Sequence, residues 1–303
     1  MLPLRRDAKV GIIHFMAFPE VMGGDGPIVE TLSRLLADDY FDAVEVTRIN
    51  DEAVAREVAR LAAESHVTLA FGAQPVLLGG KLNLNALDEG ERAKAVGAVR
   101  SCLDQAALLK AVGVAVLAGP CPAGREAEAG EALVGSLIEL SRAAAPYGLK
   151  LVLEVFDDAI DKKALVGKAP VARALGERVR AACPNFGLMH DLSHLPLLGE
   201  SPREALDPIK HLLVHMHMGN CIMGDASQEG YGDQHPRFGV PGGENDVEQV
   251  VEFLRVLYEV GYLGGDERRI LSFEVKPLPG EDSERVIAGS KRVLNEAVAR
   301  LDL

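Results

Sequence analysis

The sequence contains no tryptophan, and only 5% of its 303 residues are aromatic. Leucine, valine and alanine must therefore fill the core, and a hydrophobic content of 48% is enough for a large one. Disulfides are not indicated either. The cysteines form no CxxC pair and no short repeated spacing, which in a chain of this size is typical of reduced thiols. They are Cys102, Cys121, Cys183 and Cys221.

Basic residues are scarce relative to acidic ones. Lys and Arg number 32 against 45 Asp and Glu, so the formal net charge is −13. Such a surface repels phosphate backbones, which excludes nucleic acid and anionic membranes as default partners, although local basic patches could still bind small anions. No apolar run is long enough for a signal peptide or a membrane span. We therefore expect a soluble, cytoplasmic protein.

Nucleotide-binding and nucleophile motifs are also missing. The segment after the first expected strand reads MAFPEVMGG, which is not the glycine-rich fingerprint of a dinucleotide-binding sheet. The chain has neither a Walker loop nor a Ser or Cys nucleophile motif. It has no internal repeat, low-complexity segment or linker. These absences disfavour a doubly wound open sheet and a division into several domains.

What the sequence does contain is a regular alternation of apolar runs and amphipathic segments. The apolar runs predict strands at 9–17, 41–46, 67–71, 114–118, 150–156, 186–190, 211–218 and 269–275. The amphipathic segments predict helices at 29–36, 51–64, 87–111, 131–145, 171–181, 202–205, 246–260 and 282–301. This alternation predicts an α/β fold, a single (β/α)8 TIM barrel over residues 1–303. Gly and Pro indicate loops at 72–84 and at 219–245.

The last four expected strands each end in a side chain that an apolar strand has no reason to carry. These are Glu154, Asp191, His217 and Glu274. The carboxyl ends of barrel strands converge on one mouth, so such residues can lie close together. The carboxylates would repel unless a cation lay among them, and the oxygen-rich set suits Mn²⁺, Mg²⁺ or Co²⁺, with Zn²⁺ also acceptable. Each residue alone could instead cap a helix, pair with an arginine or be a hydrogen-bonded core histidine.

The motifs around these residues resemble the xylose-isomerase-like TIM-barrel superfamily of sugar isomerases and epimerases, in particular its tagatose-3-epimerase-like members. The motifs are LVLEVF, FGLMHDLSH, VHMHMGN, RFGVPGGENDV and SFEVKP. The resemblance implies one divalent metal, with manganese favoured, held by Glu154, Asp191, His217 and Glu274. His217 is preferred to His215 because the second histidine of the family's HxH strand end is the ligand. Glu154 and Glu274 are implied to act as acid and base from opposite faces of the substrate.

The implied activity is that of a divalent-metal-dependent isomerase or epimerase of a sugar, a keto-sugar or a small hydroxy-carbonyl compound. Removing a proton beside a carbonyl leaves charge on the carbonyl oxygen, and a metal that chelates this oxygen would stabilise the enediolate. An acid and a base on opposite faces then give epimerisation. A proton carried between adjacent carbons gives aldose–ketose isomerisation instead.

Substrate contacts are implied for His194 and Arg237, and the family position of Glu45 also lies near the substrate. Lys276 follows the last ligand by two residues, shares its strand face and could reach a substrate oxygen. Other roles remain open for these residues. His194 could hold a neighbouring ligand in place, and Arg237 could be a surface arginine. Glu45 could pair with Arg48.

One departure from the family pattern is Asp233-Gln234-His235 in the long loop. The related apurinic-site endonucleases use a DxH sequence here, together with the histidine of a DxxH motif, to hold an additional zinc. The DxxH motif of this chain runs from Asp191 to His194. Asp233, His235 and His194 therefore form a candidate second site. Those enzymes need further histidines after strands two and three, which this chain lacks, and the negative charge disfavours DNA. The loop could instead be a lid over the substrate.

Three other functions remain as alternatives to the isomerase. A lyase or dehydratase on the same scaffold would lose a β-hydroxyl from the enediolate. A zinc-dependent apurinic-site endonuclease would use the second metal site, and a non-catalytic barrel would bind a sugar without exchanging its protons. Barrels of this kind commonly pair, so a homo-oligomer is also expected.

Overall fold

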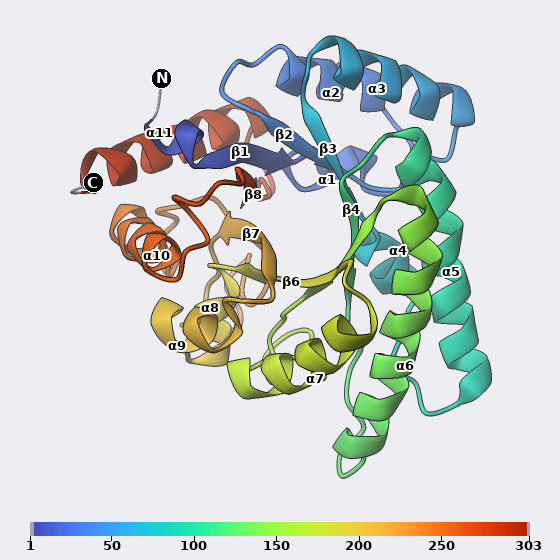
Figure 1. Cartoon of the computed structure of the whole chain (residues 1–303). Helices are drawn as coiled ribbons and strands as arrows, with labels where there is room; N and C mark the ends of the chain where they lie inside the picture. The colour runs from blue at the N-terminus through green and yellow to red at the C-terminus, as the bar shows by residue number, and fades with distance from the viewer. Residues whose placement is uncertain (1–2, 302–303) are drawn as a thin grey trace.

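Eight parallel strands close into a barrel within residues 3–301, the part of the chain that the computed structural model describes (Figure 1). Each strand is hydrogen-bonded to the next, and the last returns to the first. The strands are β1 (Ala8–Ile13), β2 (Ala43–Val46), β3 (Thr68–Gly72), β4 (Gly113–Leu117), β5 (Lys150–Glu154), β6 (Phe186–Asp191), β7 (Leu213–Gly219) and β8 (Arg269–Glu274). The predicted (β/α)8 TIM barrel is confirmed.

Helices surround the strands and form the outer layer (Figure 1). They are α1 (His14–Ala17), α2 (Ile28–Leu36), α3 (Glu52–Glu64), α4 (Gln74–Gly79), α5 (Glu89–Leu108), α6 (Glu126–Ala144), α7 (Ala169–Ala182), α8 (His194–Leu198), α9 (Pro202–Leu206), α10 (Val247–Glu259) and α11 (Ser283–Ala299). Short 3₁₀ turns lie at Pro3–Arg6, Pro19–Val21, Ala145–Tyr147 and Asp207–Ile209. Within residues 3–301, no helix combines the length and the apolar character that crossing a membrane requires.

Several element boundaries differ from the sequence predictions. The first strand ends at Ile13 rather than at residue 17, because the chain there turns into the single helical turn α1. The stretch 72–84, expected to be a loop, contains α4, and Pro75 is compatible with this helix because proline is tolerated in the first turn. The strand expected from residue 114 begins at Gly113. The helix expected from residue 131 begins at Glu126.

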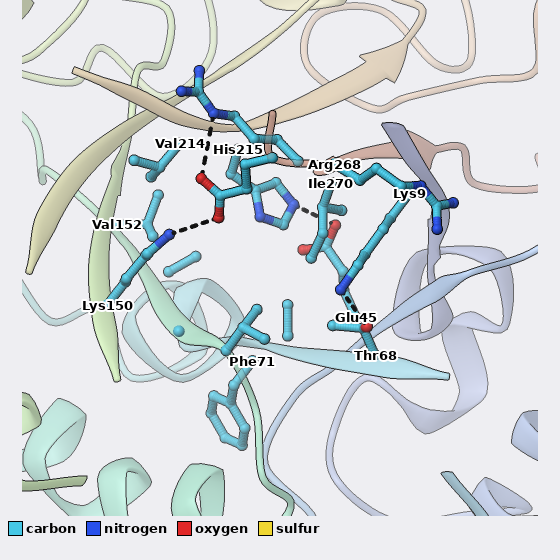
Figure 2. A pocket seen from close by; sticks show the side chains of 16 residues that line it. Lys9, Glu45, Thr68, Phe71, Lys150, Val152, Val214, His215, Arg268 and Ile270 are labelled. Atoms are coloured by element: carbon cyan, nitrogen blue, oxygen red, sulfur yellow. Dashed lines mark hydrogen bonds and ion pairs between the residues drawn. The ribbon is translucent and has the colours of Figure 1, made fainter. Parts of the chain in front are cut away.

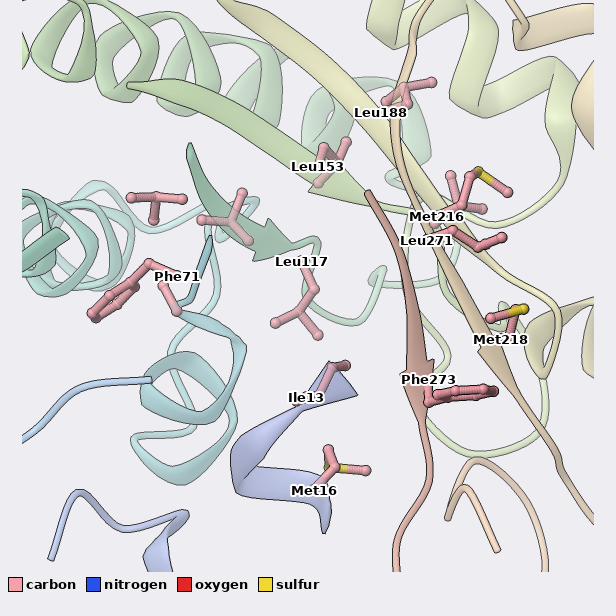
Figure 3. Packing of buried hydrophobic residues seen from close by; sticks show 14 of the residues in the cluster. Ile13, Met16, Phe71, Leu117, Leu153, Leu188, Met216, Met218, Leu271 and Phe273 are labelled. Atoms are coloured by element: carbon pink, nitrogen blue, oxygen red, sulfur yellow. The ribbon is translucent and has the colours of Figure 1, made fainter. Parts of the chain in front are cut away.

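Side chains alternate between the helix layer and the barrel interior along each strand. Leu153 and Phe273 belong to the main hydrophobic cluster that packs the strands against the helices (Figure 3). The residues that follow them, Glu154 and Glu274, therefore face the barrel axis. Core packing on one face of each strand thus places the charged strand ends inside the mouth.

A bulge in β7 decides which side chains of that strand face inward. The pairing with β6 skips Val214, which is an extra residue between Leu213 and His215. The bulge shifts the alternation by one position, so that Val214 and His215 line the same cavity. His217, two residues beyond His215, then also faces the interior and lines the cavity at the carboxyl end.

Candidate metal centre

The carboxyl ends of four neighbouring strands bring the predicted ligands together. These are Glu154 on β5, Asp191 on β6, His217 on β7 and Glu274 on β8. One ligand atom from each lies within 4.8 Å of those of the other three. Nδ1 of His217 lies 2.7 Å from Oε2 of Glu274, 3.5 Å from Oε1 of Glu154 and 4.0 Å from Oδ2 of Asp191. Four side chains that are distant in sequence therefore surround one point.

The same side chains are buried, and each has one polar atom without a hydrogen-bond partner. The most exposed of them, Glu274, has 8% of its surface accessible. The unpartnered atoms are Oε1 of Glu154, Oδ2 of Asp191, Nδ1 of His217 and Oε2 of Glu274. Burying carboxylate oxygens without donors is unfavourable, and a divalent cation would satisfy all four atoms at once. The residues therefore fit a metal ion, and three oxygen donors with one nitrogen suit several divalent metals.

Glu45 on β2 orients the histidine of this cluster. Its Oε1 lies 3.1 Å from Nε2 of His217 and 2.8 Å from Nε2 of His215. Burial alone would raise the pKa of Glu45, but the two imidazoles outweigh it and hold the pKa well below its usual range. Glu45 is thus a carboxylate that accepts from both Nε2–H groups. Nδ1 of His217 is the atom left to face the other ligands, as a metal-binding histidine requires.

The two glutamates of the cluster have different surroundings. Gln74, the first residue of α4, donates from Nε2 to Oε2 of Glu154 at 2.8 Å, so that the other oxygen of Glu154 faces the cluster. Burial raises the pKa of Glu274 to about 7, although His235 and His217 oppose the shift. A carboxyl group with a pKa near neutrality can either hold or release a proton at physiological pH. The site therefore combines one oriented carboxylate with one that can carry a proton.

A solvent-open cavity of about 1190 Å³ lies above the cluster. Glu154, His217 and Glu274 form part of its floor, and Gln74 stands beside them. The walls are largely apolar, with Ile13, Phe15, Met16, Met22, Pro75, Leu78 and Phe156. This arrangement admits a small molecule that presents its oxygen atoms to the floor and its carbon skeleton to the walls.

The four predicted substrate contacts fall in two groups. Glu45 and Lys276 line the cavity, and Glu45 is paired with histidines rather than with Arg48. His194 and Arg237 are not part of the lining. His194 is fully buried, with Nδ1 2.7 Å from a backbone carbonyl oxygen, and Arg237 donates from Nε to Glu281 at 2.8 Å.

A second cluster consists of His194, Asp233 and His235, whose ligand atoms also lie within 4.8 Å of one another. Oδ1 of Asp233 lies 3.1 Å from Nε2 of His194 and 3.0 Å from Nε2 of His235. Nζ of Lys162 lies 3.0 Å from Oδ2 of Asp233. Burial lowers the pKa of His194, but Asp233 outweighs this effect and raises the pKa to about 10. The charge of Asp233 is therefore balanced by the protein's own cations.

Residues 34–296 match the family model of the xylose isomerase-like TIM barrel. The chain belongs to this family. No curated protein matches its sequence. Among solved structures, a D-tagatose 3-epimerase-like protein is 19% identical, with 96% of this chain and 97% of that chain covered and a TM-score of 0.71. D-psicose 3-epimerase from Clostridium cellulolyticum H10 is 18% identical, with 97% of each chain covered and a TM-score of 0.63.

A third similar structure is the IolI protein with a bound zinc atom, which is 17% identical, with 97% of this chain and 100% of that chain covered and a TM-score of 0.72. At these identities the likeness to solved structures shows the fold.

Sequence reasoning missed Lys162 and the apolar wall of the cavity. Lys162 lies in the loop after β5, where the carboxylate of Asp157 accepts hydrogen bonds from the backbone N–H groups of residues 160–162 and holds the loop in place. A lysine in the loop after a ligand-bearing strand is the only signal that the sequence offers for it. Phe15 and Met16 escaped notice because they were assigned to the first strand instead of to α1.

Proposed function

We propose that the protein is a divalent-metal-dependent isomerase or epimerase of a sugar, a keto-sugar or a small hydroxy-carbonyl compound. The observation that carries the proposal is the set of four buried, unpartnered ligand atoms beneath a solvent-open cavity. Manganese is the favoured metal, with Mg²⁺, Co²⁺ and Zn²⁺ as alternatives. The names of the similar structures, a D-tagatose 3-epimerase-like protein and a D-psicose 3-epimerase, support the same substrate class.

The two glutamates are proposed to move the proton. Glu154 and Glu274 both line the cavity, from strands on different sides of the ligand cluster. Gln74 holds Glu154 in place through one of its oxygens, and Glu154 is proposed to act as the base. Glu274 lines the same cavity and is proposed to exchange the second proton with the substrate. When bound, the metal supplies positive charge that stabilises negative charge on a substrate oxygen.

Other residues would position the substrate rather than react with it. Lys276 lies on the cavity wall next to the last ligand strand and is proposed to contact a substrate oxygen. Phe15 and Phe156 also line the cavity and are proposed to keep bulk water away from the reacting carbon. His194 is proposed to act through Asp233 and not by direct contact, because its side chain is fully buried.

The experiment that tests the proposal is metal analysis followed by solvent deuterium exchange. The purified protein is expected to contain one divalent ion per chain. In heavy water, a member of a ketose panel should gain deuterium at a carbon beside its carbonyl group, and a chelator should stop the exchange. Tight sugar binding without exchange would point to a non-catalytic barrel. A product lighter by one water would point to the lyase.

The second cluster is the one observation that favours the endonuclease. Its three ligands are in place, but Lys162 already neutralises Asp233. The residues after β2 and β3 are Thr47 and Ala73, where the endonucleases carry further histidines. Incision of abasic DNA that a chelator abolishes would establish this function, and we expect none.

A further inference from the structure

The amino-terminal end of the barrel contains a second cavity, separate from the one above the ligand cluster (Figure 2). The free space here, counted together with the solvent at the opening, is about 590 Å³. Its opening is formed by side chains at the starts of β1, β3, β5 and β8, including Lys9, Thr68, Lys150 and Arg269. This end of a TIM barrel usually serves stability, and bulky side chains usually fill the interior. A solvent-open cavity in this place is therefore unusual.

Small side chains leave the space free. Ala70 on β3 and Ala115 on β4 line the inner part of the cavity, where larger residues would close it. Val152, Val214 and Ile270 line the remaining inner wall. All five side chains are apolar, so the inner part of the cavity offers hydrophobic contacts to a ligand and almost no hydrogen bonds.

The opening is surrounded by more positive than negative charge. The basic residues that line the cavity are Lys9, Lys150, Arg268 and Arg269, against Glu267 on the rim and the inner Glu45. Glu267 lies 3.4 Å from Nζ of Lys150 and 3.8 Å from Nε of Arg269, so one carboxylate is shared between two cations. In a protein with a net charge of −13, this opening is a local site of positive potential.

Lys9 is the cation at this opening without an acidic partner. Its ammonium group donates to Oγ1 of Thr68 at 3.0 Å (Figure 2), and among residues 3–301 it forms no ion pair with a carboxylate. Arg268, by comparison, lies 2.9 Å from the carboxylate of Asp42. The half-buried ammonium of Lys9 is therefore available to an anion from solution.

The inner end of the cavity carries one polar group. His215 lines the cavity with 7% of its surface accessible, and its Nε2 is bonded to Glu45 (Figure 2). Within residues 3–301 its other ring nitrogen, Nδ1, makes no hydrogen bond. The cavity thus has a basic opening, an apolar middle and a single imidazole at its inner end.

We propose that this cavity binds a small monocarboxylate with a short apolar tail. The carboxylate lies between Lys9, Lys150 and Arg269, and the tail contacts Ala115 and Val214. Inorganic phosphate fits less well, because it has no apolar part and its second charge would face the apolar inner wall. None of the four proposed metal ligands lines this cavity, so binding here can be tested independently of the proposed function.

The test is isothermal titration of the full chain with butyrate, with butyramide as its uncharged analogue and inorganic phosphate as the competing anion. We expect butyrate to bind, butyramide to show no binding, and phosphate to bind more weakly than butyrate. Equal binding of butyramide would show that the carboxylate charge does not contribute to binding. Tighter binding of phosphate would show that contact between an apolar tail and the inner wall does not determine the affinity. Either result would overturn the proposal.

Two rim variants should change butyrate affinity in opposite directions. Lys9→Gln removes the unpaired cation and should weaken binding about fivefold, whereas Glu267→Gln frees Lys150 and Arg269 and should strengthen it about threefold. The control is Lys94→Gln, an exposed lysine of α5, which should leave the affinity unchanged. The proposal is overturned if Lys9→Gln and Glu267→Gln behave like this control.

A cavity-filling variant tests the location of the tail. Ala115→Leu places a larger side chain in the inner part of the cavity and should abolish butyrate binding, with thermal melting as the check that the variant folds. Retained binding by the folded variant would place the ligand elsewhere. If the variant fails to fold, the rim variants still decide the question, because their side chains reach solvent.

Discussion

The two ends of the barrel carry opposite charge and are connected through Glu45, which lines both cavities. At the carboxyl end, three carboxylates and one imidazole are buried, and each has one atom without a hydrogen-bond partner. At the amino end, most of the cations reach solvent and already have partners of their own. Buried charges without partners are strongly unfavourable until a ligand arrives, whereas exposed pairs contribute little. Changes at the carboxyl end should therefore have the larger effects.

The largest expected effect is on proton transfer. Glu154→Gln and Glu274→Gln keep the shape of each side chain but can neither take nor deliver a proton, so each should slow deuterium exchange by roughly 10²- to 10⁴-fold. The rate is measured at saturating metal by mass spectrometry. Glu52→Gln, an exposed residue of α3, is the control. An exchange rate within tenfold of the wild-type rate would show that these glutamates do not transfer the proton.

Metal binding should stabilise the fold, because it relieves the repulsion at the carboxyl end. At a free Mn²⁺ concentration about 1,000 times the Kd, the gain in the free energy of unfolding is about 4 kcal/mol. For a chain of this size this corresponds to a rise in Tm of roughly 8 °C. Calorimetry with and without chelator measures it. Asp191→Asn should lose most of the rise, and an equal rise in this variant would place the metal elsewhere.

Glu45→Gln should weaken metal binding although Glu45 is not a ligand. An amide cannot hold both imidazole Nε2–H groups as the carboxylate does, so Nδ1 of His217 is less well fixed. The expected loss of affinity is about 10- to 100-fold, measured by competition with a fluorescent chelator. Glu64→Gln, at the exposed end of α3, serves as the control. If the affinity of Glu45→Gln stays within about twofold, the histidine does not depend on this carboxylate.

Metal affinity should also depend on pH through Glu274. Below its pKa of about 7 this buried group holds a proton that the metal must displace, and above that pH it is already ionised. The slope of log affinity against pH should therefore steepen by about one unit as pH falls through 7. In Glu274→Gln this step should be missing. A wild-type slope that is constant from pH 6 to pH 8 would contradict the assignment.

The smallest effect is expected from the amino end. Lys9→Gln should change the exchange rate and the metal affinity by less than about twofold, because a partly exposed group bonded to a hydroxyl contributes little to a distant site. The same two assays measure it. A larger change would mean that the ends of the barrel are coupled through Glu45.

The fold and the four proposed ligands could be read from the sequence because each depends on a local signal. Apolar runs with the length of strands alternate with amphipathic helices, and residues such as Glu154 and Asp191 interrupt an apolar run at its end. The short helix α4 was missed because glycine and proline also mark loops. With it, the hydrogen bond from Gln74 to Glu154 was missed too.

The sequence by itself determined that the chain alternates strands and helices and that polar side chains close the last four strands, because periodicity and composition are local properties. Only the tertiary structure decided which nitrogen of His217 faces the other three proposed ligands, because Glu45, from the other side of the barrel, pairs with Nε2. It also decided that the bulge at Val214 turns His215 and His217 inward, and that Lys162 reaches Asp233. These contacts join residues far apart in the chain, and barrel closure, not local pattern, brings them together.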